Sequence, residues 1–68
     1  MNTLKDILKL YKISNGELAQ YLNLSEGTTS LKVNKKATFN VEEAKKIKLL
    51  IKEKTGKDIP LDFLFIDN

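Results

Sequence analysis

The side chains that could carry chemistry in this chain are those of lysine, serine, threonine, asparagine and the acidic residues. Its 68 residues include no histidine and no cysteine, so the commonest general base, the commonest metal ligand and disulfides are excluded. Four glutamates stand near the starts of predicted helices, where a carboxylate complements the helix dipole: Glu17, Glu26, Glu42 and Glu43. None is paired with a nucleophile or with further metal ligands. We therefore expect no enzyme, no metal site and no cofactor, and the remaining polar groups favour binding.

The charge of the chain restricts what such a binding surface would recognise. All twelve basic residues are lysines, and with nine acidic residues they give a net charge of +3. This mild excess is weak evidence for a polyanionic partner. Because arginine is absent, its bidentate contact with guanine is excluded, and direct reading of DNA bases would depend on Lys, Thr, Ser, Asn or Glu.

Length and hydropathy indicate one small domain over residues 1–68, whose folding buries only about 60% of the surface that the unfolded chain exposes. The longest apolar runs, residues 49–51 and 63–66, are too short to cross a bilayer. The N-terminal residues form an amphipathic pattern, unlike the apolar run of a signal peptide. We expect a cytoplasmic protein without a membrane partner.

Two helix start signals stand close together in the first half of the chain. Ser14 begins a helical pattern over residues 15–22, and Ser25 begins a second one that ends near residues 32–34. Asn23, which tolerates left-handed backbone angles, lies at the corner between them. The pattern predicts a helix-turn-helix, in which two short helices meet at a tight corner and the second fits the major groove of DNA.

Helices are also predicted at both ends of the chain. The first covers residues 3–12, with Thr3 and Asp6 as a rough capping box. A last short turn of helix covers residues 61–65. No strand pattern of useful length and no repeat is present, so the sequence predicts an all-α fold.

A longer helix precedes that last turn. Asn40 and Glu43 have the spacing of a capping box, and Gly56 supplies a natural end. The preceding segment, residues 35–39, lacks helical periodicity and is predicted to be a loop whose Phe39 enters the core.

Four short motifs follow one another along the chain: Ser14-Asn15-Gly16-Glu17-Leu18-Ala19-Gln20, Leu24-Ser25, Ser30 to Asn34, and Asn40 to Ile47. In this order they resemble the Cro/cI-type helix-turn-helix domains of the XRE family, above all the small versions carried by temperate phages of Gram-positive bacteria. The resemblance extends over about residues 3–66. It implies a five-helix lambda-repressor-like domain that binds operator DNA, usually as a dimer, and regulates transcription in the manner of a Cro-like repressor.

Within this docking mode, roles in DNA binding fall on the two central helices and the residues beside them. Base contacts are assigned to Glu26, Gly27, Thr28, Ser30 and Lys32. Phosphate contacts are assigned to Ser14, Asn15, Ser25, Lys35 and Lys36. Short polar side chains suit base edges, a glutamate can accept a hydrogen bond from cytosine N4, and lysines that neutralise phosphates release counterions.

The C-terminal region holds Phe63, Phe65 and Ile66 within four residues, and one short helix cannot turn all three inward. Exposed apolar patches on small proteins often mark interfaces. We expect a homodimer through these residues. The alternative is a tail that folds back over the bundle.

A second interpretation belongs to another class of function. Glu26, Gly27, Leu31 and the apolar C-terminal region also fit a protein-interaction module of the same fold, such as an antirepressor that binds a phage repressor. A third possibility is the antitoxin of a toxin–antitoxin pair, which would be expected to carry an additional toxin-binding tail. Repressor, activator and antirepressor therefore stay open at this point, as does the operator sequence.

Overall fold

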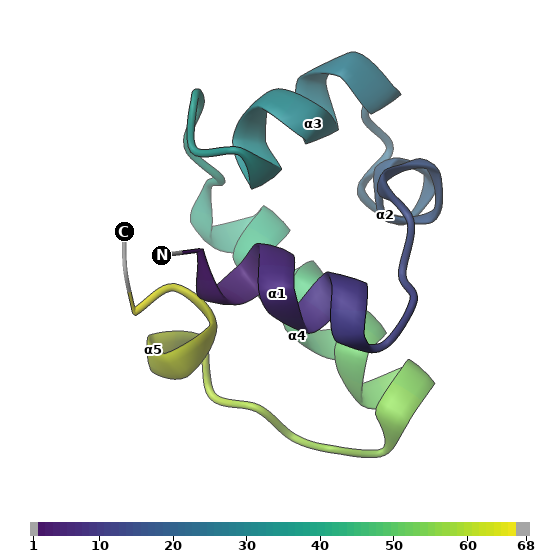
Figure 1. Ribbon diagram of the computed structural model, residues 1–68, viewed down its shortest axis with the longest axis vertical. Helices are drawn as coiled ribbons and strands as arrows, with labels where there is room; N and C mark the ends of the chain where they lie inside the picture. Colours follow the sequence, from purple (N-terminus) through teal and green to yellow (C-terminus); the bar gives the residue numbers. More distant parts are fainter. Residues whose placement is uncertain (1, 67–68) are drawn as a thin grey trace.

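The computed structural model describes residues 2–66, and all regular secondary structure in this part of the chain is helical (Figure 1). The helices are α1 (Thr3–Leu10), α2 (Asn15–Leu22), α3 (Glu26–Val33), α4 (Val41–Thr55) and α5 (Leu61–Leu64). The prediction of an all-α fold is thus confirmed.

The starts of three helices follow directly from their capping residues. The hydroxyls of Ser14 and Ser25 each accept a hydrogen bond of 3.1 Å from the backbone N–H three residues later. The predicted capping box of α4 is complete: Asn40 Oδ1 accepts from the Glu43 N–H at 2.8 Å, and Glu43 Oε1 accepts from the Asn40 N–H at 2.9 Å. These hydrogen bonds join residues three apart, so the sequence alone predicts them.

Two helix ends were also predicted correctly. Asn23 adopts left-handed backbone angles after α2, with φ of 58°, and Gly56 does the same after α4, with φ of 73°. A left-handed residue turns the chain out of the helical path, and Gly and Asn adopt this conformation most readily. Because of the turn at Asn23, only three residues separate the end of α2 from the start of α3.

The first and last helices are shorter than predicted. Asn2, not Thr3, caps α1, because its side chain accepts a hydrogen bond of 3.1 Å from the Lys5 N–H and Asn is the better N-cap residue. This helix ends at Leu10 rather than residue 12, since Lys12 takes a left-handed φ of 59°. Similarly, α5 ends at Leu64 and Phe65 follows it as the C-cap.

The core lies where α1, α2, α4 and α5 face one another. Its completely buried members are Leu18 from α2, Ile47 and Ile51 from α4, and Leu64 from α5. Phe39 is half-buried and packs against this core, as predicted for the loop before α4. An ion pair between Lys54 and Glu17 also joins α4 to α2. Together these contacts make the bundle a firm base for α3.

Helix α3 lies at one end of the molecule, and the C-terminal end of α4 lies at the other (Figure 1). It packs against α2 and buries only Thr29 and Val33. The side chain of Thr29 is completely buried. Most of the surface of α3 therefore faces away from the bundle. In residues 2–66, no helix has both the length and the apolar character needed to cross a membrane.

Candidate nucleic-acid interface

The outward face of α3 is formed by side chains at helical spacing. Gly27, Leu31 and Asn34 are exposed, with Leu31 at 49%, and Ser30 between them is half-buried. Around Gly27 the space is open, since a Cβ built there meets nothing within 4 Å. Asn34 was not among the predicted contacts, although its position seven residues after Gly27 places it on the same face.

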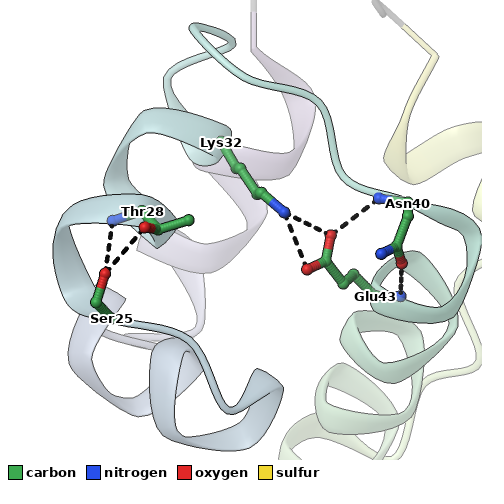
Figure 2. A network of polar contacts seen from close by, with 5 residues as sticks. All are labelled: Ser25, Thr28, Lys32, Asn40 and Glu43. Atoms are coloured by element: carbon green, nitrogen blue, oxygen red, sulfur yellow. Dashed lines mark hydrogen bonds and ion pairs between the residues drawn. The ribbon is translucent and has the colours of Figure 1, made fainter.

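The predicted base-contact residues of α3 occupy different environments. Glu26 and Gly27 are exposed at its N-terminal end, whereas Thr28 is half-buried. The Thr28 hydroxyl accepts a hydrogen bond of 2.9 Å from the hydroxyl of Ser25, which also caps the helix (Figure 2). The Ser30 hydroxyl accepts a longer one, 3.3 Å, from the side-chain amide of Asn34. The hydroxyls of Thr28 and Ser30 thus stand beside the exposed face and are held in place by neighbouring side chains.

Lys32 differs from the prediction. Figure 2 shows its side chain reaching from α3 to the start of α4, where Nζ lies 2.8 and 2.9 Å from the two carboxylate oxygens of Glu43. The Lys32 side chain is only 16% exposed, and its ammonium group lies 5.9 Å from the centre of the Phe39 ring. A partly buried carboxylate and an aromatic face both attract this cation. In this position the Lys32 ammonium group is paired with Glu43 on α4, whereas the prediction of a base contact needs it to extend from the exposed face of α3.

Glu43 is the centre of this polar network. Burial would raise the pKa of its carboxyl group, but hydrogen bonds from Lys32 and the Asn40 N–H, with the positive charges of Lys32 and Lys46, more than offset this, and its pKa is lowered. The carboxylate therefore stays ionised and links the α4 cap to the middle of α3.

The end of α3 is held by residues from the start of the chain. The side-chain amide of Asn2 donates a hydrogen bond of 2.6 Å to the carbonyl oxygen of Val33. Lys5 Nζ donates one of 2.8 Å to the side-chain oxygen of Asn34. Because α3 is tied to α4 through Lys32 and to the start of α1 through Asn34 and Val33, its orientation is fixed at two points.

The predicted phosphate-contact residues lie around α3. Lys35 and Lys36 are exposed immediately after the helix, and Lys35 has a left-handed φ of 64°. Ser25 is exposed at the start of α3, while Ser14 is exposed and Asn15 half-buried at the start of α2. These five residues are Ser14, Asn15, Ser25, Lys35 and Lys36. The structure places them at the starts of α2 and α3 and just after α3. It also brings the starts of these two helices close together.

That proximity is visible at Gly16, in the first turn of α2. A Cβ built on Gly16 would lie 3.2 Å from Glu26 Oε1 and 3.4 Å from the Glu26 carboxyl carbon. The carboxylate at the start of α3 therefore rests against the first turn of α2. Nothing in the local sequence signals this contact.

The three residues predicted for the dimer interface differ in their exposure. Phe63 and Ile66 are 50% and 64% exposed, whereas Phe65 is half-buried and meets Phe39 edge-on with ring centres 6.1 Å apart. Phe65 and Ile66 line a groove of about 490 Å³ beside the first turn of α4. The other residues around it are Phe39, Asn40, Val41, Ala44, Leu61 and Asp62.

Comparisons of the chain with protein-family models, with curated proteins and with solved structures find no match.

Proposed function

We propose that the protein is a sequence-specific DNA-binding regulator of the Cro type, in which α2 and α3 form a helix-turn-helix and α3 enters the major groove of an operator. The observation that carries this proposal is the outward face of α3, which no other part of residues 2–66 covers. The opposite side of the helix is held by contacts with α4 and with the start of the chain. A helix held in this way can meet the edges of base pairs without first being ordered. Such a regulator acts in the cytoplasm of a bacterial host and has no catalytic activity.

Gly27 supports the same interpretation. A glycine inside a helix costs about 1 kcal/mol relative to alanine, and the open space around it shows that no neighbour in residues 2–66 requires its small size. A partner that approaches the helix closely supplies a reason for the glycine. The sugar–phosphate backbone and the base edges of a duplex are partners of this kind.

The charges around α3 fit a division of labour in binding. Lys35 and Lys36 supply contacts to phosphate. These contacts release counterions, so their contribution to affinity depends on the salt concentration but not on the DNA sequence. The short side chains of Thr28 and Ser30 supply contacts to base edges. Lys32 orients α3 through Glu43 instead of reading bases.

The exposed apolar residues of the C-terminal region fit a homodimer, and a two-fold dimer would recognise an operator with two related half-sites. Phe63 and Ile66 offer exposed apolar surface, and Ile66 also lines the groove at α4. The domain measures 27 × 23 × 22 Å, so two copies side by side can place their α3 helices about 34 Å apart, one turn of DNA. Sedimentation that stays monomeric at high protein concentration would reject the dimer.

Fluorescence anisotropy with labelled duplexes tests the DNA-binding function. The wild-type protein is expected to bind duplex DNA with an affinity that falls steeply with salt, and Lys35→Ala is expected to weaken binding to all sequences by a similar factor and reduce the salt slope by about 1. Thr28→Ala is expected to alter the preference among operators instead. Lys45→Ala, on the exposed side of α4, is the charge-matched control and should change little.

Two results would reject this function. One is the absence of binding to any duplex, including the promoter of its own gene, at low salt. The other is an equal effect of Lys35→Ala and Thr28→Ala on every sequence, because the two residues would then lack distinct roles.

A second candidate function is a protein-interaction module, such as an antirepressor that binds a phage repressor. It is favoured by Leu31, an apolar side chain that is 49% exposed at the centre of the α3 face. A mobility-shift titration of promoter DNA, with and without a repressor encoded by a neighbouring gene, separates the two functions. An antirepressor releases the repressor from DNA and does not shift the DNA alone.

A further inference from the structure

Glu26 is an acidic residue within the surface proposed to face DNA phosphates. It is the first residue of α3 and is exposed, and its carboxylate rests against Gly16 in the first turn of α2. Backbone N–H groups in a first helical turn have no acceptor inside the helix, and the helix dipole favours negative charge there. The absence of a side chain on Gly16 leaves room for the carboxylate, because a Cβ would stand 3.2 Å from Oε1. The Glu26 carboxylate therefore lies against the first turn of α2, in the space that the missing side chain of Gly16 leaves open.

A duplex that approaches α3 disturbs this arrangement. Phosphates close to the starts of α2 and α3 repel the carboxylate, and they approach the same N–H groups. Glu26 then leaves its place against Gly16 and turns into the groove. On most sequences it finds no hydrogen-bond donor there, and its repulsion from the phosphates opposes binding. Where a cytosine stands opposite it, the N4 amino group donates to the carboxylate and compensates for the repulsion.

We infer that Glu26 is a specificity-determining residue that opposes DNA binding in general and permits it where the operator presents cytosine to the start of α3. The inference rests on the proposed DNA-binding function and adds a role that operates by penalising incorrect sites. Specificity is a difference between affinities, and a repulsive element increases it as effectively as a new attraction. This role explains why a chain that has a net positive charge places a carboxylate at this position.

The test compares Glu26→Gln with the wild-type protein and with Glu53→Gln, which makes the same charge change on exposed α4 surface away from α3. We expect Glu26→Gln to bind a duplex of random sequence about fivefold more tightly at low salt, equivalent to about 1 kcal/mol. Glu53→Gln should change this affinity much less. Selection from a random duplex library should show cytosine preferred at one position of each half-site by the wild type and adenine there by Glu26→Gln, since glutamine pairs with adenine.

The outcomes separate this inference from the function on which it rests. If the wild type binds DNA and Glu26→Gln binds random duplex no more tightly than Glu53→Gln does, the inference alone is overturned. If none of the three folded proteins binds any duplex, the proposed function is rejected and the inference is rejected with it. The starting contact has its own test without DNA: nuclear Overhauser contacts between the Gly16 α-protons and the Glu26 side chain are expected, and their absence would overturn the inference.

Discussion

The Lys32 ammonium group lies 2.8 and 2.9 Å from the two carboxylate oxygens of Glu43, which joins the middle of α3 to the first turn of α4 (Figure 2). Both side chains are largely shielded from water, at 16% and 11% exposure. Glu43 also completes the capping box of α4. One carboxylate therefore starts a helix of the bundle and orients the helix proposed to meet DNA.

Replacing Lys32 by methionine should destabilise the protein without removing a DNA contact. Lys32→Met keeps the length of the side chain but leaves the Glu43 carboxylate partly buried without its cation, at a cost of about 1–3 kcal/mol in the free energy of unfolding. Urea denaturation measures this loss. If Lys32 only positions α3, the variant weakens operator binding while the slope of affinity against salt stays unchanged.

The double variant Lys32→Met/Glu43→Gln supplies the control for that pair. Because the two groups interact directly, the double variant should lose less stability than the sum of the single losses, with a coupling energy of about 1 kcal/mol or more. A salt slope that falls by about 1 in Lys32→Met would instead show that this lysine contacts phosphate.

The lowered pKa of Glu43 predicts how stability depends on pH. The folded protein holds the carboxylate ionised below its ordinary pKa of 4.5, so the stabilisation is fully present above that value and is lost as the pH falls through the lowered pKa. The free energy of unfolding should therefore decline below about pH 4.5, and Glu43→Gln should show a smaller decline. Urea denaturation of both proteins at a series of acidic pH values measures the difference. Parallel curves would contradict the assignment.

Thr29 offers a way to stabilise α3. Its hydroxyl oxygen is buried without a hydrogen-bond partner in the described structure, and burying an unpaired hydroxyl is unfavourable. Thr29→Val has nearly the same shape and should raise the free energy of unfolding by about 1 kcal/mol. Thr28→Val is the matched control, because the Thr28 hydroxyl accepts a hydrogen bond from Ser25 and its removal should bring no gain. Thermal denaturation of the two variants compares them directly.

The left-handed backbone conformation of Lys35 should lower the stability of the fold, whereas its positive charge should favour DNA binding. Its φ of 64° is left-handed, a conformation that disfavours residues other than glycine by about 1–2 kcal/mol. Lys35→Gly should therefore stabilise the fold by about 0.5–1 kcal/mol while weakening binding to every duplex, since a phosphate contact is lost. Lys12→Gly, at φ of 59°, is the control for the stability gain. Tighter DNA binding by Lys35→Gly would contradict the assigned role of Lys35.

Much of the helical framework can be predicted from the chain because its signals act over three or four residues. Ser14, Ser25 and the pair Asn40–Glu43 each bond to a backbone group three positions away, and Asn23 and Gly56 end their helices through their own backbone angles. Such interactions do not require the rest of the fold. The cap of α1 was missed because Asn2 and Thr3 are adjacent competitors for one position.

The directions of the long polar side chains depend on which helices become neighbours. Lys32 lies on a helix whose local pattern allows an outward direction, and it turns inward because packing brings Glu43, eleven residues later, within reach. Glu26 meets Gly16 only because the turn at Asn23 brings the starts of α2 and α3 together. Periodicity places each residue on a side of its helix, but a flexible charged side chain takes its direction from partners that the assembled bundle supplies.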